Sequence, residues 1–140
     1  MLNITQKELE RAFKKHNTFL NSQRDKANNS YKLILFYAVE CGLKSLWMWE
    51  HKLNGTGKET GRGQKATGFL HNLNYLLKEM KWDRKILKAH TKNNEKVDHQ
   101  NLHVAWRYGK QLEESSEIRC VEDLESIRCQ LEKKIRSLRN

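Results

Sequence analysis

The sequence predicts an all-α domain, an up-and-down antiparallel bundle of four to five helices. None of the 140 residues is proline, and five of the seven glycines lie together between residues 54 and 68. Residues that favour helices dominate elsewhere, with apolar positions recurring at spacings of three and four. The alternation typical of half-buried strands is missing. A chain of this length fits one domain, residues 1–140.

A capping box predicts the start of the first helix. Thr5 and Glu8 are three residues apart, so each side chain can bond a free backbone N–H of the first turn. The face expected to be buried consists of Leu9, Ala12, Phe13, His16, Phe19 and Leu20.

The most apolar stretch, Tyr31–Trp49, predicts a central helix. Its apolar residues lie all round the helical circumference, so other helices must surround it. Ser30 is the expected N-cap and Glu50 the approximate end. Gly42 has no local purpose in a helix, so we expect a close approach of another helix at this position.

Two charged residues interrupt this apolar helix. Glu40 and Lys44 have i, i+4 spacing with the acid first, the order that pairs best. Because a buried charge is costly unless paired, either they pair with each other or Glu40 meets a basic residue such as Arg107. The pair is either purely structural or it orients a residue of a functional site.

The remaining helices follow from the same spacing. An apolar stripe from Phe69 to Met80 predicts a helix ending near Trp82, with His71 and Asn72 in its first turn. Asp83 to His90 is expected to add a helical segment. Asp98 is the expected cap of a helix that contains His99, His103, Trp106, Arg107 and Tyr108. The last helix is amphipathic through Val121, Leu124, Ile127, Leu131, Ile135 and Leu138.

Charge and cysteine content indicate the class of partner and the compartment. The formal net charge of +10 favours an anionic partner, nucleic acid first and an acidic protein second. Cys41, Cys120 and Cys129 form no C-x-x-C pair, so they are expected to be reduced core residues in the cytoplasm. The N-terminus lacks an apolar signal core and no apolar run is long enough for a membrane span.

The glycine-rich segment from Asn54 to Gly68 is expected to be a mobile basic loop. It contains Lys58 and Arg62, which are candidate binding residues. A nucleotide P-loop is disfavoured, because Glu59 follows Lys58 where Ser or Thr is needed and a preceding strand is missing.

The strongest polar pattern is His99, His103 and Arg107, which would share one face of a helix at i, i+4 and i+8. Histidine can move a proton near neutral pH and arginine can stabilise a phosphate, which favours an RNA or phosphate site. A metal site is a weaker alternative, because no third ligand is visible. The remaining interpretation is that these residues form a row on the protein surface, packed beside Trp106, without a functional role.

A second pair, Arg84 and His90, has R-x5-H spacing. Four lysines nearby could hold a polyanion, although a solvated basic face is an equally good reading: Lys85, Lys88, Lys92 and Lys96.

Three segments in order resemble the HEPN superfamily of small helical bundles. Y-A-V-E-C-G-L-K-S-L-W, residues 37–47, is similar to that family's central E-x-x-L-K-A-L helix. F-L-H-N-L-N-Y-L-L-K-E-M, residues 69–80, is similar to its H-D-L-x-x-L-L helix start, and W-R-Y-G, residues 106–109, to its R-Y segment. The likeness covers roughly half of the chain. The matching positions are Glu40, Leu43, Lys44, His71, Asn72, Leu73, Arg107 and Tyr108.

The resemblance implies a helical bundle that is commonly a homodimer and acts in bacterial toxin–antitoxin or abortive-infection systems, or beside nucleotidyltransferases. Many members are metal-independent RNases with an R-x4-6-H motif and no cofactor, and others bind a nucleotide or a partner protein. Arg84 and His90 fit the motif's spacing, with Lys85 in place of the usual polar residue after arginine. His103 and Arg107 have the reversed order.

The sequence therefore leaves two candidate functions. The first is an RNA-directed effector of a defence or toxin–antitoxin system, a candidate metal-independent endoribonuclease using Arg84, His90, His103 or Arg107. The second is a non-catalytic module that binds a nucleotide, a nucleic acid or a partner such as an antitoxin, a nucleotidyltransferase or a defence-complex protein.

Overall fold

The computed structural model describes residues 2–138 and is mainly helical within them. The five α-helices are α1 (Gln6–Ser22), α2 (Asn29–Glu50), α3 (Leu73–Glu79), α4 (Leu102–Tyr108) and α5 (Glu114–Ser137). Two short 3-10 helices, η1 (Ala66–Phe69) and η2 (His99–Asn101), precede α3 and α4. A two-stranded antiparallel sheet pairs β1 (Ala89–His90) with β2 (Lys96–Val97). The predicted mainly helical architecture is confirmed.

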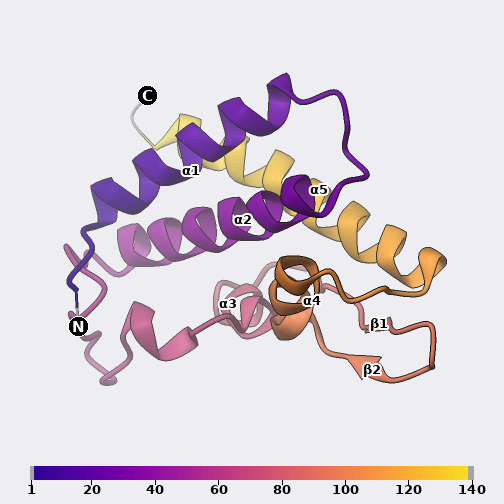
Figure 1. The fold of residues 1–140 in the computed structure, drawn as a ribbon. Helices are drawn as coiled ribbons and strands as arrows, with labels where there is room; N and C mark the ends of the chain where they lie inside the picture. The colour runs from indigo at the N-terminus through magenta and orange to yellow at the C-terminus, as the bar shows by residue number, and fades with distance from the viewer. Residues whose placement is uncertain (1, 139–140) are drawn as a thin grey trace.

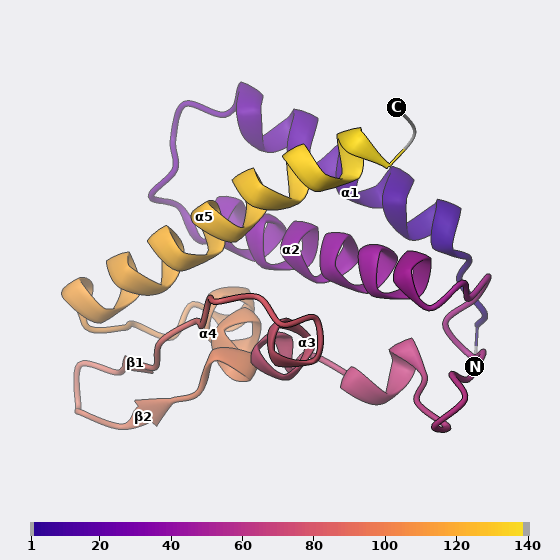
Figure 2. The same ribbon diagram turned by 180° about the vertical axis from the view of Figure 1, so that it is seen from behind.

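Helix α2 lies in the middle of the molecule. Helices α1 and α5 cover one side of it, and the short helices α3 and α4 lie on the other side (Figures 1 and 2). Both sides of α2 are consequently buried, as its apolar circumference predicts.

The helices do not all alternate in direction. Helix α2 runs antiparallel to α1, but α5 runs in the same direction as α2 (Figures 1 and 2). The contacts agree, because the start of α2 meets the first half of α5 through an ion pair of 3.2 Å between Lys32 and Glu117. The reason is that the chain returns past α3 and α4 to the end of the molecule where α2 begins, so the strict up-and-down order does not extend to α5.

Side-chain caps fix the starts of the first two helices. The capping box of Thr5 and Glu8 is present, as predicted. Helix α2 is capped by Asn28, whose side chain accepts a 2.7 Å hydrogen bond from the N–H of Tyr31. Ser30 therefore lies inside the first turn, and the prediction that it caps the helix is wrong.

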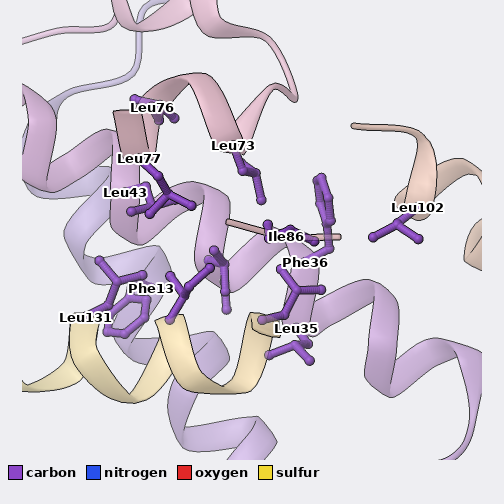
Figure 3. Packing of buried hydrophobic residues seen from close by; sticks show 14 of the residues in the cluster. Phe13, Leu35, Phe36, Leu43, Leu73, Leu76, Leu77, Ile86, Leu102 and Leu131 are labelled. Carbon is purple, nitrogen blue, oxygen red and sulfur yellow. The ribbon is translucent and has the colours of Figure 1, made fainter. Parts of the chain in front are cut away.

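Gly42 lies at a close contact of three helices. A Cβ atom at this position would lie 2.8 Å from Leu131 of α5 and 2.8 Å from Phe13 of α1. These two side chains lie side by side in the core (Figure 3). The predicted close contact at Gly42 is confirmed.

The third helix is shorter than predicted. Leu70 has a positive φ of 51°, so the chain bends between η1 and α3. Asn72 then caps α3 by accepting a 3.1 Å hydrogen bond from the N–H of Tyr75. His71 consequently precedes the helix instead of lying in its first turn.

The chain bends at Asp83, and residues 84–88 lead into β1 without regular secondary structure, so the helix predicted from Asp83 to His90 is wrong. Side chains of other elements satisfy the backbone of this segment. Asn74 accepts a 2.8 Å hydrogen bond from the N–H of Ile86, and the hydroxyl of Ser116 accepts one of 3.1 Å from the N–H of His90. The predicted helix from Asp98 is also divided, because α4 begins only at Leu102 and Asp98 makes no side-chain cap of η2.

The cysteines and the glycine-rich loop depart in part from expectation. Cys120 is buried in the core and Cys41 is half-buried, but Cys129 is exposed, so the prediction of three core cysteines is wrong for Cys129.

The glycine-rich loop is attached at its start, since the backbone N–H of Thr56 donates a 2.8 Å hydrogen bond to the carbonyl of Ile4. None of the helices within residues 2–138 combines the length and apolarity that crossing a membrane requires.

We expect Gly42→Ala to destabilise the protein. The added methyl group would overpack the contact with Phe13 and Leu131, at a cost of about 1–3 kcal/mol, of which the better helix propensity of alanine returns about 1 kcal/mol. Urea unfolding should show a lower midpoint with an unchanged slope. Gly61→Ala is the control, because nothing lies within 4 Å of a Cβ there. Equal midpoints for the two variants would contradict the assigned role of Gly42.

Candidate functional site

Glu40 is the polar exception in α2 and the centre of the candidate site. Its side chain is 12% exposed and accepts a 2.8 Å ion-paired hydrogen bond from Nζ of Lys44, which is 14% exposed. The predicted ion pair within the helix is confirmed. The alternative partner, Arg107, instead contacts Tyr37.

A second basic group, His71, meets the same carboxylate from outside the helix. Nδ1 of His71 lies 3.1 Å from Oε2 of Glu40. An ionised carboxylate only accepts hydrogen bonds, so Nδ1 must carry the hydrogen, which leaves Nε2 as the reactive nitrogen. The His71 side chain is 46% exposed, so this nitrogen belongs to a ring that solvent reaches.

His103 of α4 lies directly beside His71. The two ring centroids are 4.1 Å apart, and His103 also stacks on Phe36 of α2 at 4.9 Å. His103 is buried, and among residues 2–138 its Nδ1 has no hydrogen-bond partner.

The surroundings of His103 favour its neutral form. Burial lowers the pKa of His103 most, and His71 lowers it further. Glu40 opposes this effect, and Arg107 adds to it. His103 is therefore a neutral ring at pH 7, packed behind the more accessible His71.

Arg107 completes the group one helical turn after His103. Its guanidinium donates a hydrogen bond to the hydroxyl of Tyr37 and lies 6.0 Å from the centre of that ring. Arg107 is exposed, and the neighbouring Tyr108 is 76% exposed. The interaction with Tyr37 raises the pKa of Arg107, so the exposed guanidinium stays positively charged.

These four residues, Glu40, His71, His103 and Arg107, are named the histidine site. Both histidines line a hollow of about 420 Å³, with the loop 68–72 on one side and residues 100–104 on the other. The tertiary fold thus brings together Glu40, His71 and Arg107 from three separate segments of the sequence.

His99 does not belong to this group. It lies in η2, not in α4, and its Nε2 accepts a 3.1 Å hydrogen bond from the backbone N–H of Asn74. The predicted row of His99, His103 and Arg107 on one helix face is therefore wrong, and His99 and His103 are not placed to chelate one ion. Burial lowers the pKa of His99 to about 4.

Arg84 and His90 are not brought together as a pair. Arg84 lines a hollow beside α3, and His90 in β1 lines a separate hollow with His99 and Arg119. The other predicted binding residues of the glycine-rich loop, Lys58 and Arg62, are exposed and lie outside the histidine hollow.

Two aromatic residues of the site, Phe36 and Tyr37, were not predicted. Tyr37 lies three residues before Glu40 and shares its helix face, so the i, i+3 spacing was a usable signal. Phe36 gave no such signal, because stacking on His103 depends on how α4 crosses α2.

Comparison with models of protein families, with curated proteins and with solved structures gives no match for this chain. Functional argument therefore depends on the geometry of the described residues. Within residues 2–138, no three His, Cys, Asp or Glu side chains are grouped so that they could hold one metal ion.

We expect acid to destabilise the fold through His99. The pKa of His99 is about 4 in the folded chain and near 6.5 in the unfolded chain, so the unfolded chain binds more protons between these values. The free energy of unfolding should fall as the pH is lowered through this window, by at most about 1.4 kcal/mol per pH unit from this group. Urea unfolding at a series of pH values measures this dependence.

The matched variant is His99→Gln, which keeps a hydrogen-bond acceptor for Asn74 but does not titrate. Its stability should depend less steeply on pH between about 4 and 6.5. An identical pH dependence in both proteins would contradict the burial of a neutral His99.

Proposed function

We propose that the chain is a HEPN-like, RNA-directed effector of a bacterial defence or toxin–antitoxin system that cleaves RNA without a metal ion. The observation that carries the proposal is the histidine site. An accessible histidine, held by a carboxylate, lies beside a second histidine and near an exposed arginine. These are the groups that phosphodiester cleavage by acid–base chemistry requires.

In the proposed reaction His71 is the general base. Its Nε2 takes the proton of a ribose 2′-hydroxyl, whose oxygen attacks the adjacent phosphorus in line with the bond to the 5′ oxygen. That bond breaks, and the proton returns from His71 to the 5′ oxygen. The products are a 2′,3′-cyclic phosphate and a 5′-hydroxyl end. Glu40 holds the ring in place through Nδ1.

Arg107 and His103 have different parts in this scheme. The exposed guanidinium of Arg107 neutralises the phosphate as negative charge develops on it. The neutral ring of His103 supports His71 by packing against both His71 and Phe36, and avoids placing a second positive charge beside a protonated His71.

Purified protein with EDTA should cleave single-stranded RNA and leave cyclic phosphate ends. His71→Ala and Arg107→Ala should each lower the cleavage rate by about 100-fold, because one loses the base and the other a charge on the transition state. Gel analysis of labelled RNA measures the rate. His51→Ala is the matched control, since His51 is exposed beside Trp47 at the end of α2.

The same assay compares the histidine site with the R-x5-H pair. Arg84→Ala and His90→Ala should reduce cleavage much less than His71→Ala, because the two residues line separate hollows. Loss of cleavage in these variants with full activity in His71→Ala would refute the assignment of the site.

A non-catalytic module is the second candidate function. Two observations favour it. His103 is buried, so His71 is the accessible member of the histidine pair, and the guanidinium of Arg107 is already hydrogen-bonded to Tyr37. Such a module would bind a nucleotide, RNA or a partner protein with strong salt dependence and without turnover. In either case the resemblance suggests a homodimer and an antitoxin, nucleotidyltransferase or defence-complex protein as partner.

A further inference from the structure

Two hollows beside α3 are rich in basic residues. One, of about 640 Å³, lies between α3 and residues 81–85, and the other, of about 450 Å³, lies beside β1 and α5. Asp83 and Asp98 are the only carboxylates among their lining residues. The basic lining residues are Lys78, Lys81, Arg84, Lys85, Lys88 and Arg119.

The two hollows adjoin each other, and the larger one adjoins the hollow of the histidine site. Asn74 and Lys85 line both basic hollows. Asn72 lines the larger basic hollow and also the hollow that contains His71 and His103. We call the two basic hollows together the basic groove; it leads from β1 along α3 to the histidine site.

Positive charges are crowded at the β1 end of the groove. Contact with the ammonium group of Lys96 and repulsion from it lower the pKa of Lys88, and Lys85 adds to the repulsion. Asp98 opposes the effect and lies 3.6 Å from Lys96. Like charges this close are unfavourable in the free protein, and an anion between them would reverse the sign of the interaction.

One aromatic ring is open to the groove. Tyr75 lines the larger hollow and is 45% exposed. The ring centres of Tyr75 and Phe69 are 5.4 Å apart, and Phe69 is buried against Trp47. Trp82 differs, because it is half-buried with the ammonium group of Lys134 5.5 Å from its ring centre. Tyr75 is therefore the ring that is supported by the core and available for stacking.

We propose that the basic groove binds a single-stranded polynucleotide, with its phosphates on Lys85, Lys88 and Arg119 and one base stacked on Tyr75. The combination of a cationic groove with an exposed aromatic ring is how proteins bind single strands without reading sequence. A duplex fits poorly, because its bases are already stacked and cannot reach Tyr75. The inference rests on the proposed RNA-directed function but does not require that RNA is cleaved.

The first test measures the salt dependence of binding. Fluorescence anisotropy of a labelled RNA single strand is followed at several salt concentrations, with all proteins carrying His71→Ala to prevent cleavage. The double variant Lys85→Ala/Lys88→Ala should bind more weakly, and its salt slope should fall by about 1.4, the value for two lost phosphate contacts on a single strand. The double variant Lys15→Ala/Lys133→Ala is the matched control, because it has the same net charge and removes exposed lysines of α1 and α5, on the opposite side of α2 (Figure 1).

The second test concerns the ring of Tyr75. Tyr75→Leu should weaken binding of the single strand by about tenfold without changing the salt slope, because a stacked base is lost and no charge is removed. Tyr75→Phe keeps the ring and should bind as the parent protein does. Equal weakening by leucine and phenylalanine would show that the ring does not stack on a base.

The remaining comparisons separate failure of the groove from failure of the proposed function. Equal affinity for an RNA duplex or for polyglutamate, or a lysine double variant that behaves like its control, would overturn the groove proposal. Binding of DNA and RNA single strands alike supports the groove and counts against an RNA-directed function, whereas a preference for RNA supports both. Binding that depends on the groove in a wild-type protein without cleavage would retain the groove and refute the RNase.

Discussion

A carboxylate in the middle of an apolar helix costs free energy unless it is paired, and Glu40 is such a carboxylate. Lys44 satisfies it from the same helix, and His71 satisfies it from the chain segment before α3. The second contact ties the short helices to α2, since His71 then meets His103 of α4. The polar interaction that α2 requires is thus also the interaction that assembles the histidine site.

The opposite side of α2 is apolar and closely packed. Gly42 allows Phe13 and Leu131 to approach the helix from α1 and α5. A buried group on the same side is also paired, because Arg128 of α5 donates to Asn17 and Asn21 of α1 at 2.7 and 2.8 Å. The three long helices are therefore closely packed against one another, and α2 presents its polar exceptions to the short elements.

The short elements are positioned by side chains rather than by regular secondary structure. Asn74 bonds both backbone groups of Ile86 and the ring of His99, so one residue joins α3, the segment before β1 and η2. The lysines of this segment, Lys85 and Lys88, line the basic groove. The larger hollow of the basic groove and the hollow of the histidine site consequently share Asn72, the N-cap of α3.

The sequence by itself determined the long helices and the capping box at Thr5, because each depends on spacing within one helix, and a glycine inside an apolar helix predicted the close contact at Gly42. It left Lys44 and Arg107 as alternative partners of Glu40, and the fold decided for Lys44. The sequence did not determine that His71 joins Glu40, that His99 turns toward Asn74, or that α5 runs parallel to α2. Residues 83–90 illustrate the reason: Asn74 and Ser116, both distant in sequence, satisfy backbone groups that a helix would have satisfied locally. Only the tertiary structure decided that His71 and His103 share a site and that His99 does not belong to it, since that depends on how α3 and α4 pack against α2.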